Sequence, residues 1–493
     1  MKRTSKLLSL LLAALMLASS LAACSGGDDP ADTTGSGDSA DTTTVPEETT
    51  ADPLADPFPD VTYDGYNFRL YGAISDTVVF STIYREEEKG ETVNDAVFNR
   101  NKAVEERFKI KITHVQSAGD VYSLYKDTIT NVASGDDFAD LVCGETLNQV
   151  YLQNALFNLK EIKSFDFDRV WWLPAAESQT VNNKLYTVQS AISYNILAYA
   201  RVIFMNTDLA KANNIEVPYD KVREGKWTLD EWINMTKDFY KDVNGDGQRD
   251  PGDIYGMVMT GTQYATIECF GVESVIMNDQ GTALVDNVMS PEFLSYVEKT
   301  CQWLYGGNVG FQWQNKSGNG WSTGNQFKAG TLLTVLNFMQ NMINLAPEFG
   351  FDYTILPVPK LDENQENYRA GSTGNNFAMP TTVKNPERDG YIIEEMSRLG
   401  YRDVYPAYKD LALRGRYSTN QDCADMVDIF ADSAWVSFAY MNFLGGDNPQ
   451  AFYLQVWGDR SPTPAAASKY EAKKSIYQKG IDQMNAHYFG TGK

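Results

Sequence analysis

Apolar and polar residues after position 60 follow two alternating periods. Apolar side chains occupy every second position in residues 66–71 and again in residues 108–112, which predicts two strands. Between them Val93, Val97 and Val104 recur at helical spacing and predict one apolar helix face. The chain therefore opens its folded part with a strand, a helix and a second strand.

The same alternation continues along the chain. The pattern predicts a helix at 121–133, strands at 138–143, 185–188 and 198–205, a helix at 229–240 and a polar final helix at 468–484. Thr228 and Glu231 form a capping box for the helix at 229–240, and Trp227 and Trp232 stand at staple positions, so both tryptophans are predicted to be structural. Strands separated by helices indicate an α/β fold with mostly parallel sheets.

The first 24 residues have the pattern of a lipoprotein signal peptide. Lys2, Arg3 and Lys6 precede an apolar run at 7–21, and small residues then lead to Cys24. The run is shorter than the roughly 20 residues that cross a bilayer. We therefore expect a signal peptide at 1–23, cleavage before Cys24, and a lipid on Cys24 that holds the protein at the outer face of the cell membrane, in the manner of a Gram-positive cell.

The segment 24–60 is rich in Asp, Thr, Ser, Gly and Pro and has little to bury, which predicts a disordered acidic tether. The formal charge is -23, and loss of the three basic residues of the signal peptide takes it to -26. So negative a chain disfavours nucleic acid and anionic lipid as partners. The membrane is therefore expected to be reached through the lipid alone.

Residues 242–253 match a calcium loop of the EF-hand type. Calcium prefers six to eight oxygen ligands, and the alternation of acidic and amide residues directs oxygens to one centre while Gly247 permits the sharp turn. The alternative is an Asp/Asn/Gly turn without a metal. The predicted ligands of a structural Ca²⁺ are Asp242, Asn244, Asp246, the Gln248 carbonyl, Asp250 and Asp253.

Signs of catalysis are weak. Residues 320–324 match the Gly-x-Ser-x-Gly nucleophile pattern, but a polar loop precedes them where an apolar strand is required, and His487 is the only histidine downstream. No zinc-protease, Cys-x-x-Cys or phosphate-loop motif occurs. Paired carboxylates of a glycoside hydrolase stay an open alternative, because their separation in space is invisible in a sequence.

Four cysteines follow Cys24. Cys143 lies in an apolar run and is predicted to be a buried thiol. A disulfide among Cys269, Cys301 and Cys423 is left open.

Several segments, read in order, resemble the extracellular solute-binding proteins of family 1, which serve ABC importers and mostly bind carbohydrates. Each segment is short, but their order and the lipoprotein start make the resemblance specific. They lie at 91–101, 104–108, 203–209, 226–231, 255–256, 327–330 and 355–360.

The resemblance implies a two-lobed fold like that of type II periplasmic binding proteins, whose lobes are joined by crossing strands and close over a solute. It places the crossings near 194–201 and 332–336. The implied division is lobe 1 at 61–195, lobe 2 at 196–330 with the calcium loop, a return to lobe 1 at 331–375, and a remainder at 376–493, mainly lobe 2 and C-terminal helices.

No ligand set can be transferred from the family, so the candidate solute-binding residues are physical predictions. Sugars need aromatic platforms framed by carboxylates and amides, and loops after strands are where such groups gather. Burial in the core is the alternative for each candidate, and Trp171 and Trp172 are predicted to be core. The candidates are Glu145, Tyr194, Trp321, Asn375 and Trp435.

The sequence thus predicts a lipid-anchored monomer that is not an enzyme and that delivers a carbohydrate, expected to be an oligosaccharide, to ABC permease subunits. The rival hypothesis is a surface-tethered polysaccharide hydrolase or lyase. An adhesion or scaffold module is a third hypothesis.

Overall fold

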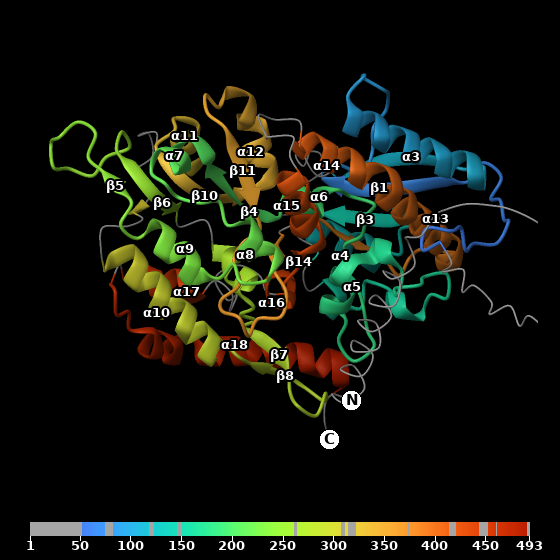
Figure 1. Ribbon diagram of the computed structural model, residues 1–493. Coiled ribbons are helices and arrows are strands. Elements are labelled where there is room, and N and C mark those ends of the chain that lie inside the picture. Colours follow the sequence, from blue (N-terminus) through green and yellow to red (C-terminus); the bar gives the residue numbers. More distant parts are fainter. Residues whose placement is uncertain are drawn as a thin grey trace, which may run out of the picture. The chain divides into compact units, whose positions relative to one another are not determined.

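Two separate sheets organise the chain after residue 51 (Figure 1). The computed structural model describes residues 52–73, 82–117, 123–144, 147, 150–260, 264–306, 311–313, 322–372, 374–413, 421–442, 452–459 and 461–490. Within these limits Asp52–Lys493 form one compact unit. The predicted signal peptide, Cys24 and most of the tether lie outside the described residues.

The first sheet has the strand order β13-β3-β1-β2 and forms the first lobe with helices α3, α4 and α13. Strand β1 is parallel to β2 and β3, and α3 and α4 connect these strands in turn, as the alternating pattern predicted. Strand β13 returns much later in the chain and pairs antiparallel with β3. The strands are β1 (Asn67–Ala73), β2 (Lys111–Ser117), β3 (Leu141–Gly144) and β13 (Asn376–Ala378).

The second sheet has the order β11-β4-β10-β6-β5, with β9 also paired to β6, and it forms the second lobe. Strands β10 and β9 are parallel to β6, whereas β4 runs antiparallel to both β10 and β11. The strands are β4 (Arg201–Asn206), β5 (Tyr240–Lys241), β6 (Ile254–Thr260), β9 (Phe311–Trp313), β10 (Leu332–Phe338) and β11 (Tyr353–Leu356).

Helices cover these sheets, and the two remaining pairs of strands are short. The pairs are β12 (Ala370–Gly371) with β14 (Ala434–Trp435) and β7 (Val275–Met277) with β8 (Leu284–Asp286). The helices are α3 (Thr92–Phe108), α4 (Leu124–Ser134), α5 (Leu173–Gln179), α6 (Asn195–Ala198), α7 (Thr207–Ala212), α8 (Tyr219–Arg223), α9 (Leu229–Thr236), α10 (Pro291–Tyr305), α11 (Thr323–Lys328), α12 (Met339–Leu345), α13 (Pro386–Leu399), α14 (Tyr405–Leu413), α15 (Gln421–Asp432), α16 (Phe438–Asn442), α17 (Phe452–Trp457) and α18 (Ala466–Phe489).

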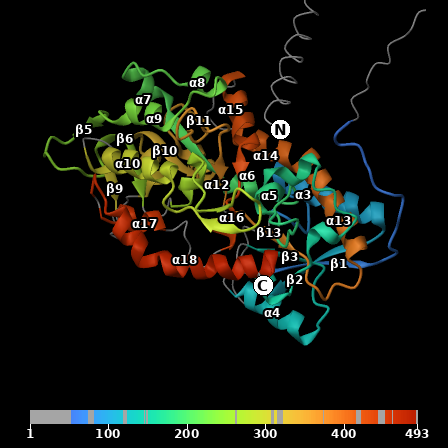
Figure 2. The same cartoon turned by 90° about the horizontal axis from the view of Figure 1, so that it is seen from below.

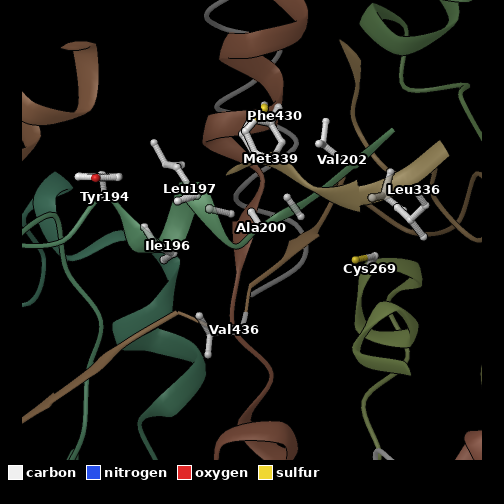
Figure 3. Packing of buried hydrophobic residues seen from close by; sticks show 14 of the residues in the cluster. Tyr194, Ile196, Leu197, Ala200, Val202, Cys269, Leu336, Met339, Phe430 and Val436 are labelled. Atoms are coloured by element: carbon white, nitrogen blue, oxygen red, sulfur yellow. The ribbon is translucent and has the colours of Figure 1, made fainter. Parts of the chain in front are cut away.

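Three segments, which we call the crossing segments, connect the two lobes: 188–201, 370–378 and 433–438. The first two run antiparallel, with bridges from Val188 to Phe377 and from Ala200 to Ser372. The second and third are joined through β12 and β14. Their apolar side chains pack together between the sheets, and Ile196, Leu197, Ala200 and Val436 are among the residues that Figure 3 shows there.

The C-terminal helix α18 spans both lobes. It packs against α17 and β8 (Figures 1 and 2), and Asn485 bonds to both main-chain groups of Leu284. At its end the ring of His487 lies 5.1 Å from that of Tyr151 in the first lobe. No described helix is both long and apolar enough to cross a bilayer.

Several predicted boundaries differ from the structure. Residues 331–375 do not return to the first lobe, because β10 and β11 both pair with β4 in the second sheet. The return is instead made by 370–378, and 332–336 is not a crossing. The remainder is divided between the lobes: β13 lies in the first sheet and α13 packs on α3, whereas α15 packs on β11 and α17 on α10. An apolar pattern identifies a strand but does not identify its distant partner.

Two local predictions also change. The helix predicted at 229–240 ends at Thr236, and Tyr240 begins the antiparallel strand β5. The end of the predicted tether is ordered on the body: Leu54 and Phe58 pack against the core, and Asp56 forms an ion pair with Arg107. These two apolar side chains give residues 52–60 something to bury, which the rest of the tether lacks.

Candidate functional site

The carboxyl ends of the strands of both sheets meet the crossing segments. In the first sheet Asn376 pairs with Gly144, the last residue of β3. In the second sheet Arg201 pairs with Phe338, the last residue of β10, which runs parallel to β6. Ligands of open α/β sheets bind beyond the carboxyl ends of the strands. The crossing segments therefore carry the side chains of a candidate binding site.

Four polar side chains on these segments are buried without partners. Asn195, Arg201, Asn375 and Asn376 are 0 to 3% exposed. Both amide atoms of each asparagine, and Nε and Nη1 of Arg201, have no hydrogen-bond partner. Gly374 packs directly on Asn195, since a Cβ at Gly374 would lie 3.3 Å from the Asn195 carbonyl oxygen. Because buried polar groups are almost always paired, this concentration indicates a place where water or a ligand supplies the partners.

Two aromatic rings stand beside these polar groups. The guanidinium carbon of Arg201 lies 4.3 Å from the ring centroid of Phe338, and the rings of Tyr199 and Phe338 are 5.6 Å apart. Both rings are half-buried. Amides, a guanidinium and exposed ring surface are the groups that bind a hydroxylated, partly apolar molecule. We call Asn195, Tyr199, Arg201, Phe338, Asn375 and Asn376 the crossing site.

The structure separates the five predicted solute-binding residues. Asn375 belongs to the crossing site. Tyr194 is 8% exposed and stacks on Tyr408 at 4.9 Å, so it lies in the core (Figure 3). Glu145 and Trp321 lie outside the described residues.

Trp435 belongs to a paired cluster on the third crossing segment. Its indole N–H donates to Glu273 at 2.9 Å, and Ser437 donates to the same carboxylate at 3.0 Å. Arg369 forms an ion pair with Glu273 at 3.2 Å and covers one face of the Trp435 ring at 4.2 Å. Burial raises the pKa of Glu273, against the effect of these donors. The N–H and one face of Trp435 are therefore already used within the protein.

Five residues of the crossing site were not predicted from the sequence: Asn195, Tyr199, Arg201, Phe338 and Asn376. Asn195 and Arg201 interrupt an apolar run at 191–205. An apolar run that admits isolated polar residues was the available signal. Phe338, the partner of Arg201, lies on a strand more than 130 positions away, and no signal in the sequence indicated it.

A pocket of about 890 Å³ lies elsewhere. Residues 160–180 of the first lobe form one wall, and residues of α14 and the end of α15 form the other. Phe167, Tyr401 and Tyr405 line it together with charges of both signs, and it shares no residue with the crossing site.

The predicted calcium loop joins β5 to β6 and is therefore a hairpin loop that no helix follows. Asp242 accepts the N–H groups of Gly245 and Gly247 at 2.6 and 2.8 Å, and both glycines have positive φ. The amide nitrogen of Asn244 lies 3.0 Å from Asp246 and 3.1 Å from Asp250. That nitrogen lies between two carboxylates, whose negative charge favours a cation at this place.

Asp253 does not act as the twelfth residue of an EF-hand loop would. It is fully buried and accepts the Val243 N–H at 3.0 Å and the Tyr240 hydroxyl at 2.9 Å. Burial raises its pKa, but these donors outweigh burial and leave the pKa lowered. Asp253 thus closes the hairpin. Within the described part of the chain, no three His, Cys, Asp or Glu side chains are grouped so as to hold a metal ion.

The serine of the nucleophile-like motif has a structural role. The Ser322 hydroxyl accepts the N–H of Asn325 at 3.0 Å and caps α11. The ring of His487 lies 5.0 Å from that of Tyr186, in the aromatic cluster at the end of α18. Cys143, Cys269, Cys301 and Cys423 are all buried free thiols, so the structure shows no disulfide among them.

Comparison with known proteins shows the class of fold. No family model and no curated protein matches the sequence. A solved cyclo/maltodextrin-binding protein in complex with maltotetraose matches with a TM-score of 0.54 at 15% identity, over 86% of this chain and 99% of that chain. UspC of M. tuberculosis matches with a TM-score of 0.55 at 14% identity, over 85% and 100%.

An ABC substrate-binding protein of Listeria monocytogenes in complex with cycloalternan matches with a TM-score of 0.52 at 12% identity, over 84% of this chain and 99% of that chain. The chain therefore has the two-lobed α/β fold of ABC substrate-binding proteins, as the resemblance implied.

Proposed function

We propose that this chain is a solute-binding protein that captures a carbohydrate between its two lobes, performs no covalent chemistry, and delivers the solute to an ABC importer. The observation that carries the proposal is the crossing site, where four buried polar side chains without partners meet two half-buried rings. A solute that satisfies groups from both lobes favours the closed arrangement through its differential contacts.

Carbohydrate is the proposed class because sugars combine many hydroxyls with apolar faces. Two of the neighbours in fold are solved with a maltotetraose and a cycloalternan. A third, UgpB of M. tuberculosis, is solved with glycerophosphocholine. The fold therefore leaves the solute open, and the side chains of the crossing site support the choice.

The test is a glycan-panel binding screen on the mature protein, with product analysis of the same mixtures. We expect saturable binding, an intact glycan and a more compact particle by small-angle scattering. Turnover of any glycan would instead support the surface-tethered hydrolase or lyase. Ser322→Ala is the control for the nucleophile-like motif in this assay, because Ser322 caps α11 and belongs to no site proposed here.

A lipid on Cys24 and a tether up to residue 51 would hold the binding protein beside its permease. We expect Cys24→Ala to release the protein into the medium and to lower uptake while the solute affinity of the purified protein stays unchanged. Release without any loss of uptake would show that anchoring is not part of delivery.

We also propose that the loop at 242–253 binds a structural Ca²⁺. Asp242, Asn244, Asp246, Asp250 and the Gln248 carbonyl supply hard oxygen donors once the Asn244 amide turns its oxygen inward. Bound Ca²⁺ would hold this loop in one conformation. Titration calorimetry with Ca²⁺ should give a binding isotherm that Asp246→Asn together with Asp250→Asn abolishes. Absence of heat and of any chelator effect on the melting temperature would remove the proposal.

A further inference from the structure

Arg201 differs from the other well-buried arginines of the lobes. It is 3% exposed, and neither Nε nor Nη1 has a hydrogen-bond partner. Arg100, at 1% exposed, donates to the carbonyl oxygens of Ile83 and Ile192. Arg398, at 7% exposed, forms an ion pair with Glu395 at 2.7 Å. Arg201 alone of these three combines deep burial with unpaired donors.

Such a charge is costly unless an anion or several acceptors reach it. Charged side chains are almost never fully buried unless they are paired, and an isolated buried charge carries a large desolvation penalty. Stacking on Phe338 at 4.3 Å offsets part of this cost but satisfies no N–H. The stacking also fixes the plane of the guanidinium, and leaves its edges for hydrogen bonding.

Glu268 is the acidic group that shares these surroundings. It is fully buried and abuts Gly371, where a Cβ would lie 2.6 Å from its Oε1. Burial raises the pKa of the Cys269 thiol, the nearby charge of Glu268 adds to this effect, and the charge of Arg201 opposes it. Neither Nε nor Nη1 of Arg201 bonds to Glu268, however. Glu268 therefore leaves these two donors unoccupied.

Arg369 is the natural comparison, because it also lies beside a crossing segment and also stacks on a ring. Its guanidinium carbon is 4.2 Å from the Trp435 centroid, and its charge is met by Glu273 at 3.2 Å. The two sites share an arginine over an aromatic ring. They differ in that Arg369 has a carboxylate of the protein as its hydrogen-bonded partner.

We propose that the solute supplies the missing carboxylate, so that the crossing site selects an acidic sugar such as a uronic-acid-containing oligosaccharide, with Arg201 as the residue that determines this specificity. This inference rests on the proposed function and names the class of its solute. A guanidinium takes a carboxylate in a bidentate fashion along one edge, which here pairs Nη2 with either Nε or Nη1, and such charge-assisted bonds are about twice as strong as neutral ones. Asn195, Asn375 and Asn376 would then bind hydroxyl groups of the same sugar.

The test compares matched glycans by titration calorimetry on the mature protein. The probes are oligogalacturonates with their methyl esters, and xylo-oligosaccharides with and without a glucuronic acid substituent. We expect the acidic member of one pair to bind at least 100-fold more tightly than its neutral partner. Arg201→Gln should abolish this preference without lowering the melting temperature, and Arg201→Lys should keep part of it. Arg369→Gln, the matched control, should keep all of it.

The outcomes separate this inference from the proposed function. Tight binding of neutral glycans with no preference for the acidic partners would overturn the inference and leave the binding protein intact. An equal loss of acidic and neutral affinity in Arg201→Gln would also overturn it, because Arg201 would then serve hydroxyl groups. Failure of every carbohydrate to bind would overturn the proposed function itself.

Discussion

Two buried polar regions of the protein use their side chains in opposite ways. The Glu394 carboxylate is paired: it accepts the indole N–H groups of Trp171 at 2.5 Å and Trp172 at 2.9 Å, and the main-chain N–H of Asp166. In the crossing site, Asn195, Arg201, Asn375 and Asn376 lie as deep and have unpaired atoms. Equally buried polar groups can therefore have different roles. Groups with partners inside the protein stabilise the fold, and groups without partners are candidates for binding.

The largest effect is expected from a substitution that disrupts the paired region around Glu394. Glu394→Gln replaces one acceptor oxygen with an NH₂ group that faces an N–H donor, so the free energy of unfolding should fall by about 2 to 3 kcal/mol. Solute affinity should stay unchanged, because Glu394 contacts no part of the crossing site. Denaturant unfolding and titration of the same preparation measure both quantities. A loss of affinity with unchanged stability would reverse our assignment of the two regions.

The next effect concerns the unpaired region. Asn375→Ala removes an amide that has no partner in the protein, so stability should stay the same or rise slightly. Solute affinity should fall by roughly 10-fold to 30-fold, which corresponds to about 1.4 to 2 kcal/mol. Unfolding and titration again report both quantities. A destabilised variant with full affinity would place Asn375 among the structural residues.

The pH dependence sharpens the same comparison. Burial raises the pKa of Glu394 to about 7, although its three N–H donors act in the opposite direction. A carboxyl whose folded pKa lies above its unfolded value of about 4.3 stabilises fully below that value, and this contribution is lost as pH rises through 7. Thermal unfolding at a series of pH values should thus show that the free energy of unfolding falls between pH 5 and 8.

The control for this pH dependence is Glu394→Gln, which should lack the same share of the decrease because it has no group to titrate. The side chains of the crossing site are asparagines, aromatic rings and an arginine, and no histidine, carboxyl or thiol is among them to change its charge between pH 6 and 8. Solute affinity should therefore stay constant in that range. Affinity that follows the stability curve would show that the two regions are coupled.

Whether a feature of the fold could be predicted from the sequence depends on how far apart along the chain the interacting residues are. Strands β1, β3 and β4, the helix α3 and the capping of α9 by Thr228 follow from local pattern and are confirmed. The strand predicted at 185–188 is wrong, because only Val188 there forms an isolated bridge. The assignment of β10 and β11 to a lobe failed, because pairing with β4 depends on residues some 130 to 150 positions apart. Burial of Trp171 and Trp172 was predicted, but the carboxylate that holds them, more than 220 positions away, was not.

The binding residues show the same limit. Asn375 was predicted from its loop, whereas Arg201 was overlooked inside an apolar strand. Tyr194 and Trp435 were chosen because aromatic residues near a crossing are suitable sugar platforms. Sequence alone could not show that the first is stacked on Tyr408 or that Arg369 covers a face of the second.

The smallest expected effect tests whether Trp435 belongs with the paired groups or with the crossing site. Trp435→Phe keeps an aromatic ring beneath Arg369 but removes the N–H that donates to Glu273. Because Ser437 and Arg369 still bond to Glu273, the free energy of unfolding should fall by only about 0.5 to 1 kcal/mol. Solute affinity should not change. A fall in affinity of 10-fold or more would show that the free face of Trp435 is a sugar platform, and would extend the crossing site to the third crossing segment.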